Sequence, residues 1–196
     1  MEFIKFLKKY YWIYKRANFR GFYYSLKFKN IKFPLIIRKD GKFRNLKFIK
    51  TDPNIIIHEN VDIFISRVES KEPKLILGSF VTIGRYSSIG CSTKITLGNH
   101  VRIAPYVHIT DRNHDYRNIN LPIWQQPILS APVFIDDETW IGYGVQIMPG
   151  VKIGKHCIIG AGSVVTNDIP DYSVAVGIPA RVVKQYDFNE KKWIKV

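Results

Sequence analysis

Aliphatic residues recur at every sixth position in the second half of the chain. The column is Ile135, Ile141, Ile147, Ile153, Ile159 and Val165, with no slip over six units. Four positions further along each unit stands a small or β-branched residue, namely Thr139, Val145, Val151, Cys157, Ser163 and Ile169. A six-residue period fits neither an α-helix nor a single strand, and it is typical of a parallel β-helix. The pattern predicts triangular coils in which each unit makes one flat side and the aliphatic residue fills the axis.

Glycines support the same interpretation. Gly142, Gly154 and Gly160 each follow an aliphatic member of the column, where a corner leaves little room for a Cβ atom. The alternative is a β-sandwich whose strands happen to be six residues apart, but six consecutive matches with the second column in phase argue against it. We therefore expect an all-β fold built on a parallel β-helix of hexapeptide repeats.

The column also runs through earlier residues, with interruptions. Its earlier members are Ile57, Ile63, Leu77, Ile83, Ile89, Leu97, Ile103 and Ile109. The charged stretch 69–74 and a two-residue slip near Ile95 break the register. Because an extra residue inside a coil would turn aliphatic side chains to solvent, each break must leave the coil as a bulge or loop. The largest break spans 110–132, and a loop of that length within a regular array is usually functional.

The first fifty residues differ from the rest. Aromatic and aliphatic residues at three-and-four spacing from Phe3 to Tyr14, with lysines between them, predict an amphipathic helix. The segment 31–48 alternates around Asp40-Gly41 and predicts a hairpin or irregular first strands leading into the coil. The predicted organisation is a basic N-terminal segment (1–50) with helix and hairpin, the β-helix (51–170) with its loop (110–132), and a C-terminal tail (171–196) that runs back over the body or ends as a last strand.

The charge is concentrated in that first segment. Of a formal net charge of +14, residues 1–50 hold fifteen Lys and Arg against two acids, while the remainder is nearly balanced. A basic, aromatic helix within residues 1–30 suits an anionic membrane surface. The alternative, compatible with the first, is that its aromatic face packs on the end of the β-helix. We find no nucleic-acid-binding motif and expect no nucleic acid as partner.

The cysteines and the hydropathy indicate a compartment. Cys91 and Cys157 are the two cysteines, and the second lies in the inward-facing column, so we expect no disulfide framework. No run reaches about eighteen apolar residues, and the first residues lack the features of a signal peptide. These observations predict a cytoplasmic protein. If the basic N-terminal segment binds an anionic membrane, the protein is expected at the inner face of that membrane.

Four motifs resemble the hexapeptide-repeat acyltransferases. They are Thr-Trp-Ile-Gly-Tyr-Gly (139–144), Met-Pro-Gly-Val-Lys-Ile-Gly (148–154), Ile-Gly-Ala-Gly-Ser-Val-Val-Thr (159–166) and Gly-Ile-Pro-Ala-Arg-Val (177–182). Over roughly residues 57–184 the chain is most similar to the galactoside, maltose and polysaccharide O-acetyltransferase branch. The resemblance implies a homotrimer of left-handed β-helices that moves an acetyl group from acetyl-coenzyme A to a saccharide hydroxyl, on a surface polysaccharide or its precursor. It implies no metal.

The resemblance places the catalytic base at His114, in the extruded loop. A sugar hydroxyl is too weak an acid to attack a thioester as an alkoxide at neutral pH, and an imidazole that removes its proton contributes about a hundred- to ten-thousandfold. Asp111, Asp115 or a backbone carbonyl are the candidates for orienting the ring. The loop residues expected to contact the substrate are Asn113, Asp115, Tyr116 and Trp124.

The resemblance also assigns residues to the coenzyme. Trp140 matches a tryptophan that borders the donor channel, although it could instead be an outward aromatic residue at a trimer interface. The other matching positions are Tyr143, Ala161, Thr166, Asn167, Arg181 and Lys184. Asn167 stands where relatives often have Lys, which removes one phosphate contact.

Other functions fit the same fold. A zinc enzyme of the γ-type carbonic anhydrase class would need three converging imidazoles, for which His100, His108 and His114 are the candidates. A non-catalytic scaffold would have no reason to keep the histidine loop and the coenzyme motifs together. An antibiotic acetyltransferase of the xenobiotic branch shares both features and is the alternative among the enzymes.

Overall fold

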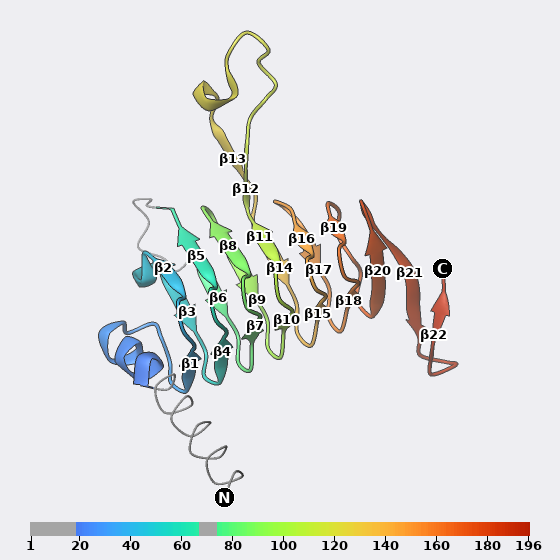
Figure 1. The fold of residues 1–196 in the computed structure, drawn as a ribbon. Coiled ribbons are helices and arrows are strands. Elements are labelled where there is room, and N and C mark those ends of the chain that lie inside the picture. Colours follow the sequence, from blue (N-terminus) through green and yellow to red (C-terminus); the bar gives the residue numbers. More distant parts are fainter. Residues whose placement is uncertain (1–18, 67–73) are drawn as a thin grey trace, which may run out of the picture.

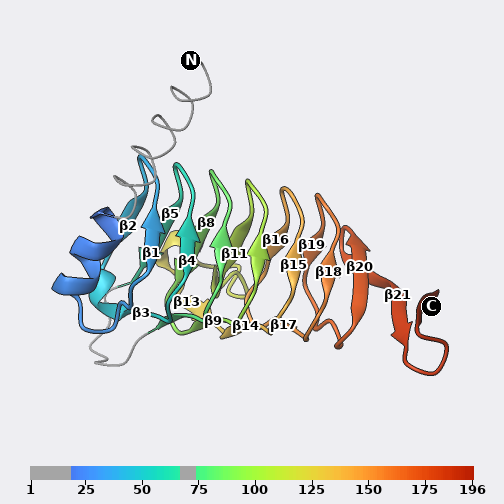
Figure 2. The same cartoon turned by 90° about the horizontal axis from the view of Figure 1, so that it is seen from below.

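The computed structural model describes residues 19–66 and 74–196, and its main body is a stack of triangular coils (Figures 1 and 2). The amphipathic helix expected from Phe3 to Tyr14 lies outside the described residues, as does nearly all of the charged stretch 69–74. Three sheets, here called I, II and III, form the sides of the prism, and within the coils neighbouring strands are parallel. The all-β parallel coil predicted from the six-residue period is confirmed.

Within the coils each turn contributes a strand to each side in succession, and sheet I also includes the antiparallel strands β21 and β22 at its C-terminal end. Sheet I contains β1 (Leu35–Ile37), β4 (Ile55–Ile57), β7 (Thr82–Ile83), β10 (Arg102–Ile103), β15 (Trp140–Ile141), β18 (Ile158–Ile159), β20 (Ser173–Gly177), β21 (Ala180–Asp187) and β22 (Lys192–Lys195). Sheet II contains β2 (Lys42–Arg44), β5 (Asp62–Ile65), β8 (Ser88–Cys91), β11 (His108–Thr110), β16 (Gln146–Ile147) and β19 (Val164–Val165). Sheet III contains β3 (Ile49–Thr51), β6 (Leu75–Leu77), β9 (Ile95–Leu97), β14 (Val133–Ile135) and β17 (Lys152–Ile153).

The aliphatic column forms the core. Ile141 pairs with Ile103 below and Ile159 above, and all six members of the column from Ile135 to Val165 are 0% exposed. Removing a side chain of this size from water contributes roughly 1.5–3 kcal/mol. The second column is buried beside it, and its hydroxyls are satisfied. Thr139 Oγ1, for example, donates to the Gly154 carbonyl at 2.8 Å and accepts from the Cys157 N–H at 3.1 Å.

The glycines sit where the coils approach most closely. A Cβ atom on Gly142 would lie 2.6 Å from the Ile159 carbonyl oxygen, and one on Gly160 would lie 2.6 Å from Val176 Cγ1. These distances are shorter than van der Waals contact, so the predicted crowding at the corners is confirmed.

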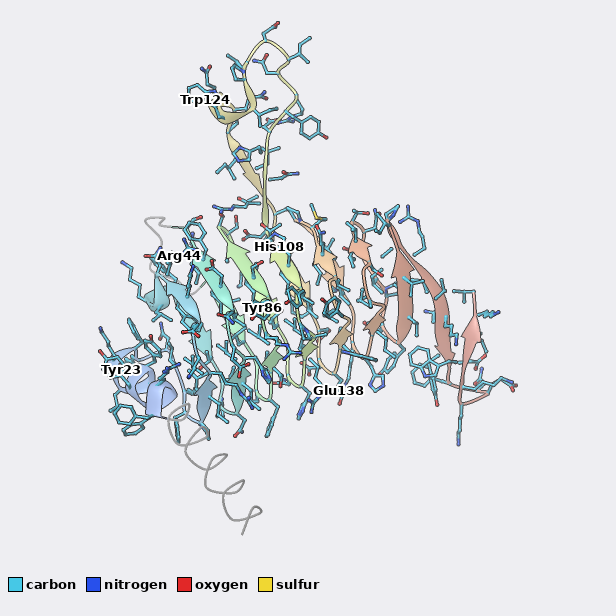
Figure 3. All side chains as sticks on the ribbon, viewed as in Figure 1. Tyr23, Arg44, Tyr86, His108, Trp124 and Glu138 are labelled. Carbon is cyan, nitrogen blue, oxygen red and sulfur yellow. The ribbon has the colours of Figure 1, made fainter. Side chains whose placement is uncertain are left out.

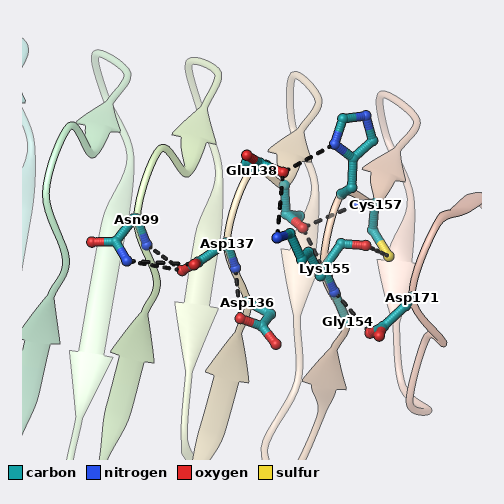
Figure 4. Close-up of polar contacts among 10 residues, drawn as sticks. Asn99, Asp136, Asp137, Glu138, Gly154, Lys155, Cys157 and Asp171 are labelled. Carbon is teal, nitrogen blue, oxygen red and sulfur yellow. Dashed lines mark hydrogen bonds and ion pairs between the residues drawn. The ribbon is translucent and has the colours of Figure 1, made fainter.

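Carboxylates pin the corner between sheets III and I across successive coils (Figure 4). Asp137 Oδ1 accepts a hydrogen bond from the Asn99 N–H at 2.6 Å, and Asp171 Oδ1 accepts one from the Lys155 N–H at 2.9 Å. Glu138 lies 3.8 Å from the Lys155 ammonium at the outer rim. The carboxylates thereby pair the backbone N–H groups of Asn99 and Lys155, which have no partner in the parallel ladders.

The predicted hairpin in the first segment is wrong, and the alternative of early strands leading into the coil is correct. β1 pairs in parallel with β4, and β2 pairs in parallel with β5, so these strands belong to the first coil. Asp40 has φ +58°, as corner residues of later coils do, so Asp40-Gly41 turns a corner between two sides. A six-residue column was present here too: Ile31, Ile37, Phe43 and Ile49.

A helix over residues 19–27 lies at the open end of this first coil (Figure 1). Tyr24, within the helix, and Phe28, just beyond its end, pack against the core and cover the apolar end of the prism. At the other end β20 continues the parallel stack on β18, and β21 and β22 close it as antiparallel strands. Among the described residues, no helix has the length and hydropathy needed to cross a bilayer.

Candidate active site

The longest break in the repeat forms a hairpin that projects from the prism (Figure 1). Its strands β12 (Arg112–His114) and β13 (Ile128–Ser130) are antiparallel, with His114 opposite Ile128, and a short 3-10 helix, η2 (Ile123–Gln125), lies near its tip. Thr93 Oγ1 donates to Ser130 Oγ at 2.6 Å, which ties the base of the hairpin to the coil. The hairpin is therefore an ordered element with a defined attachment.

Asp111 holds the coil together at this base. Its carboxylate is fully buried and accepts hydrogen bonds from three consecutive backbone N–H groups, those of Ser92, Thr93 and Lys94, at 2.7, 2.6 and 2.8 Å. These three residues form the bulge that the two-residue slip near Ile95 predicts. Asp111 thus stabilises the bulge, and the hypothesis that it orients the ring of His114 is wrong.

The carboxylate of Asp115 is also engaged in hydrogen bonds, in this case with Arg117. Arg117 donates to its two oxygens from Nε and Nη2 at 2.9 and 2.6 Å, and the same side-chain hydrogen bonding holds the pKa of the Asp115 carboxyl below its usual range. The Asp115 N–H donates to the Pro127 carbonyl at 2.9 Å, across the hairpin. In this chain Asp115 orders the loop, so the second candidate for orienting His114 is wrong as well.

His114 lines a cleft of about 510 Å³ between the hairpin and the outer face of sheet II. Its backbone N–H donates to Asn113 Oδ1 at 3.0 Å, so these two predicted residues lie together. The cleft is lined chiefly by His108, Arg112, Asn113, His114, Gln146 and Met148. Tyr116 and Trp124 lie elsewhere: they are 69% and 77% exposed, and Trp124 is near the far end of the hairpin (Figure 3).

His108 is a cleft residue that the sequence analysis left without a role in acetyl transfer. Its Nδ1 lies 2.7 Å from Ser88 Oγ. Burial, and to a smaller extent the charge of Arg112, lowers the pKa of the His108 imidazole and so favours the neutral ring. The register holds the signal that could have identified it, because a residue directly before the aliphatic column points outward. His108 and Gln146 both hold that position and pair with each other.

The three histidines considered as zinc ligands do not converge within one chain. The His100 ring stacks on Phe80, with centroids 4.8 Å apart, at the corner between sheets III and I, whereas His108 lies on sheet II. In the described part of the chain no three His, Cys, Asp or Glu side chains form a cluster suited to a metal ion.

The residues assigned to the coenzyme lie on two sides of the prism. Trp140 is half-exposed on sheet I. Across the neighbouring strands of this sheet, its row of paired residues continues through Ile158 and Val174 to Lys184. Tyr143 and Ala161 occupy the next corner on successive coils, because the Gly162 N–H donates to the Tyr143 carbonyl at 2.8 Å.

Thr166 and Asn167 lie at a different corner, between sheets II and III, one coil beyond Met148 of the cleft. The Met148 N–H donates to the Val165 carbonyl at 3.0 Å, and Thr166 Oγ1 donates to Asn167 Oδ1 at 2.9 Å. Arg181 is exposed on β21, opposite Val176. One chain therefore groups His114 with Thr166 and Asn167 on one side, and Trp140 with Lys184 on another.

Comparison with known proteins gives consistent matches. Residues 132–167 match the family model "Bacterial transferase hexapeptide (six repeats)". The chain is 30% identical over 172 residues to the Escherichia coli K12 protein named "Putative lipopolysaccharide biosynthesis O-acetyl transferase WbbJ", covering 84% of this chain and 83% of that protein. It is 35% identical over 127 residues to galactoside O-acetyltransferase of Escherichia coli K12, covering 59% of each.

The coverage of other relatives is smaller. The 41% identity to "Probable acetyltransferase Rv3034c" of Mycobacterium tuberculosis spans 117 residues and 39% of that protein. Among solved structures, the N-acyltransferase AntD of Bacillus cereus matches with a TM-score of 0.69 at 21% identity, covering 83% of this chain and 84% of that one, which shows the fold alone.

A maltose O-acetyltransferase of Clostridium difficile 630 matches with a TM-score of 0.54 at 26% identity, covering 84% of this chain and 73% of that one. The alignment with WbbJ extends across most of both proteins, and the repeat model matches the coils that follow the hairpin. This chain belongs to the hexapeptide-repeat acyltransferases, and its coils form a left-handed β-helix.

Proposed function

We propose that this protein transfers an acetyl group from acetyl-coenzyme A to a hydroxyl of a saccharide, with His114 as the general base. The observation that carries the proposal is the hairpin, which leaves an otherwise regular array once at length and places the exposed His114 at the edge of a cleft with Asn113 and His108. The printed names of the relatives, a galactoside and a lipopolysaccharide O-acetyltransferase, support the reaction and the acceptor class.

The chemistry needs one proton carrier. As the acceptor oxygen attacks the thioester carbonyl, His114 takes the hydroxyl proton, and the carbonyl oxygen becomes an oxyanion that backbone N–H groups stabilise. When the intermediate collapses, the carbon–sulfur bond breaks and the imidazolium returns its proton to the thiolate. No acyl-enzyme is required, because donor and acceptor meet in one ternary complex and their proximity lowers the barrier.

The donor site of the proposal needs two copies of the chain. Trp140, Tyr143 and Ala161 lie along sheet I and its corner, away from the cleft on sheet II that contains His114. A homotrimer with parallel axes would set sheet I of one copy beside sheet II of the next, so that the coenzyme lies in the groove between them. Its phosphates would then contact Thr166, Asn167, Arg181 and Lys184.

A subunit-mixing experiment tests this shared site. We expect His114→Ala and Trp140→Ala to be impaired when each is alone, whereas trimers assembled from equal amounts of both have about a quarter of their sites intact by random mixing. The transfer rate of the mixture should therefore exceed the mean of the two separate variants, measured as thiol release from acetyl-coenzyme A. A mixture that only equals that mean would place the complete site within a single chain.

The N-terminal end of the prism is the part that we propose to contact an anionic membrane. Helix 19–27 exposes Phe19, Phe22, Tyr23 and Leu26, and it lies within the strongly basic first fifty residues. A basic surface with exposed aromatic and aliphatic side chains binds anionic lipid by combining charge with insertion of the apolar groups. The acceptor would then be a membrane-linked saccharide, met at the inner face of the membrane.

Vesicle co-sedimentation tests the contact. We expect the protein to bind phosphatidylglycerol vesicles and a Phe22→Ser, Leu26→Ser double variant to bind about tenfold more weakly, because two exposed apolar side chains are lost. Val196→Ser, which alters an exposed aliphatic residue at the other end, is the matched control and should bind as the unchanged protein does. Equal binding of all three proteins would contradict the proposed contact.

A further inference from the structure

The cleft that contains His114 continues along sheet II toward the first coils. A second hollow of about 380 Å³ shares Gly90, His108 and Arg112 with that cleft. It extends to Arg44, Asp62 and Phe64, on the coils nearer the N-terminal end. Arg44 and His108 both lie along the edge of the prism from which the hairpin rises (Figure 3). We call the combined surface of Arg44, Asp62, Phe64, Gly90, His108 and Arg112 the trough.

Two guanidinium groups lie against one aromatic ring in the trough. The Cζ atoms of Arg44 and Arg112 are 4.9 and 4.8 Å from the centroid of the Phe64 ring. Arg44 also donates to both oxygens of Asp62 at 2.8 and 2.9 Å, and Arg112 donates to Ser66 Oγ at 3.2 Å. Contacts of this kind hold long side chains in one place, so less conformational entropy is lost when they bind a ligand.

Gly90 forms the floor between the two parts of the trough. It lies within β8, between Phe64 of β5 and Thr110 of β11 in the sheet register. Its φ is not in the left-handed region, and a Cβ atom there would come no closer than 3.5 Å to Thr110 Oγ1, an ordinary contact. The backbone does not require a glycine at this position. A strand glycine is often found at a bulge, such as the one at residues 92–94, or where a ligand or another backbone approaches closely, and its missing Cβ leaves the floor of the trough open.

The trough is well placed to hold part of an acceptor. Arg112 and His114 are two residues apart on β12, so their Cα atoms are separated by about 7 Å along the strand. A single sugar unit can bridge a separation of this size. Arginine binds carboxylate and phosphate through paired N–H donors, and it remains charged at every physiological pH.

We propose that the trough binds an oxyanion carried by the acceptor saccharide, held by Arg112 and Arg44 while the reacting hydroxyl lies at His114. The acceptor is then an acidic saccharide, whose charge comes from a uronic acid carboxylate or from a sugar phosphate. This inference rests on the proposed function for the role of His114. The open floor at Gly90 admits the ring that carries the charge.

Binding measurements with charge-matched sugars test the proposal. By calorimetry on the full chain, methyl galacturonide, methyl glucuronide and galactose 1-phosphate are compared with the neutral methyl galactoside and methyl glucoside. We expect an acidic member to bind at least about tenfold more tightly than its neutral counterpart, and high salt to reduce the preference. Whichever binds more tightly, the uronic acid glycosides or the sugar phosphate, identifies whether the acceptor carries a carboxylate or a phosphate.

Variants assign the preference to the trough. Arg112→Gln and Arg44→Gln should each weaken binding of the acidic sugar about tenfold, and Gly90→Val should weaken it by filling the floor. Lys42→Gln is the matched control, because Lys42 lies on the same strand as Arg44 but does not line the trough, and it should change binding less than about twofold. Thermal unfolding checks that each variant is folded.

Two results would overturn the inference. One is equal binding of acidic and neutral sugars in every pair, and the other is a loss of coenzyme A affinity in Arg112→Gln with acidic sugar binding unchanged. If the enzyme acetylated neutral and acidic glycosides equally well, the trough would have no role in acceptor recognition, while the proposed function would stand. If acidic sugars bound preferentially but no saccharide were acetylated, the anion-binding role of the trough would stand and the proposed function would fail.

Discussion

His114→Ala is expected to lower kcat for acetyl transfer by at least about a hundredfold, while the affinity for acetyl-coenzyme A stays within about twofold. The acceptor hydroxyl keeps its proton at neutral pH, so its attack on the thioester is slow unless a base removes the proton in the transition state. The residues assigned to the coenzyme are on other strands, so the loss of one imidazole leaves them in place. The effect should therefore fall on the chemical step.

Steady-state thiol release, with coenzyme affinity measured separately by calorimetry, distinguishes these two quantities. His156→Ala is the matched control, because His156 is an exposed histidine at the corner between sheets III and I and contacts Glu138 at 3.3 Å. It should keep normal turnover. If His114→Ala lost donor binding but showed normal residual turnover, His114 would be a binding residue and our assignment of the base would be wrong.

The second large effect is expected at Asp111, on stability. Hydrogen bonds to a charged group contribute about 1.5–3 kcal/mol each, and Asp111→Ala removes three of them from the bulge. Part of this loss is recovered because water can reach some of the freed N–H groups. We expect the free energy of unfolding to fall by about 3–5 kcal/mol. Asp111→Asn should recover part of it, since an amide oxygen in the place of Oδ2 keeps the bonds from Thr93 and Lys94, while the N–H₂ then faces the Ser92 N–H.

Denaturant unfolding at a fixed protein concentration measures this loss, since assembly would otherwise change the apparent stability. Asp168→Ala is the control, because the Asp168 carboxylate accepts one backbone bond, from the Lys152 N–H at 2.8 Å, in an exposed position. Asp168→Ala should lower the free energy of unfolding by about 1 kcal/mol. An equal effect of the two substitutions would show that the bulge does not depend on the buried carboxylate.

Asp111 also illustrates where sequence reasoning about the site fails. The residue is three positions before His114, so a role beside the imidazole is the natural expectation from the chain. Its actual partners are residues 92–94, which the stacking of coils places next to it. Asp115 is similar, because its carboxylate is taken by Arg117 within the loop. Which of several nearby groups a polar side chain binds depends on distances that spacing along the chain does not contain.

The fold was easier to predict from the sequence than the contacts of the site, because the six-residue period is a local pattern that repeats along the chain. One residue in each unit must face the axis, so the column from Ile135 to Val165 could be assigned without coordinates, and all of it is buried. The first coil was harder to recognise because Asp40-Gly41 also has the composition of a hairpin turn. Only the pairing of β1 with β4 and of β2 with β5 distinguishes a corner from a hairpin.

The amino-acid sequence by itself determined that this chain coils in units of six, that the array is interrupted at length between residues 110 and 132, and that His114 lies in the interruption. The tertiary structure alone decided that His108 and Gln146 line the same cleft, and that Trp140 lies on a different side of the prism. The physical reason is that a period specifies which way each side chain points, whereas contact across a surface depends on how many residues each coil takes to return to the same side.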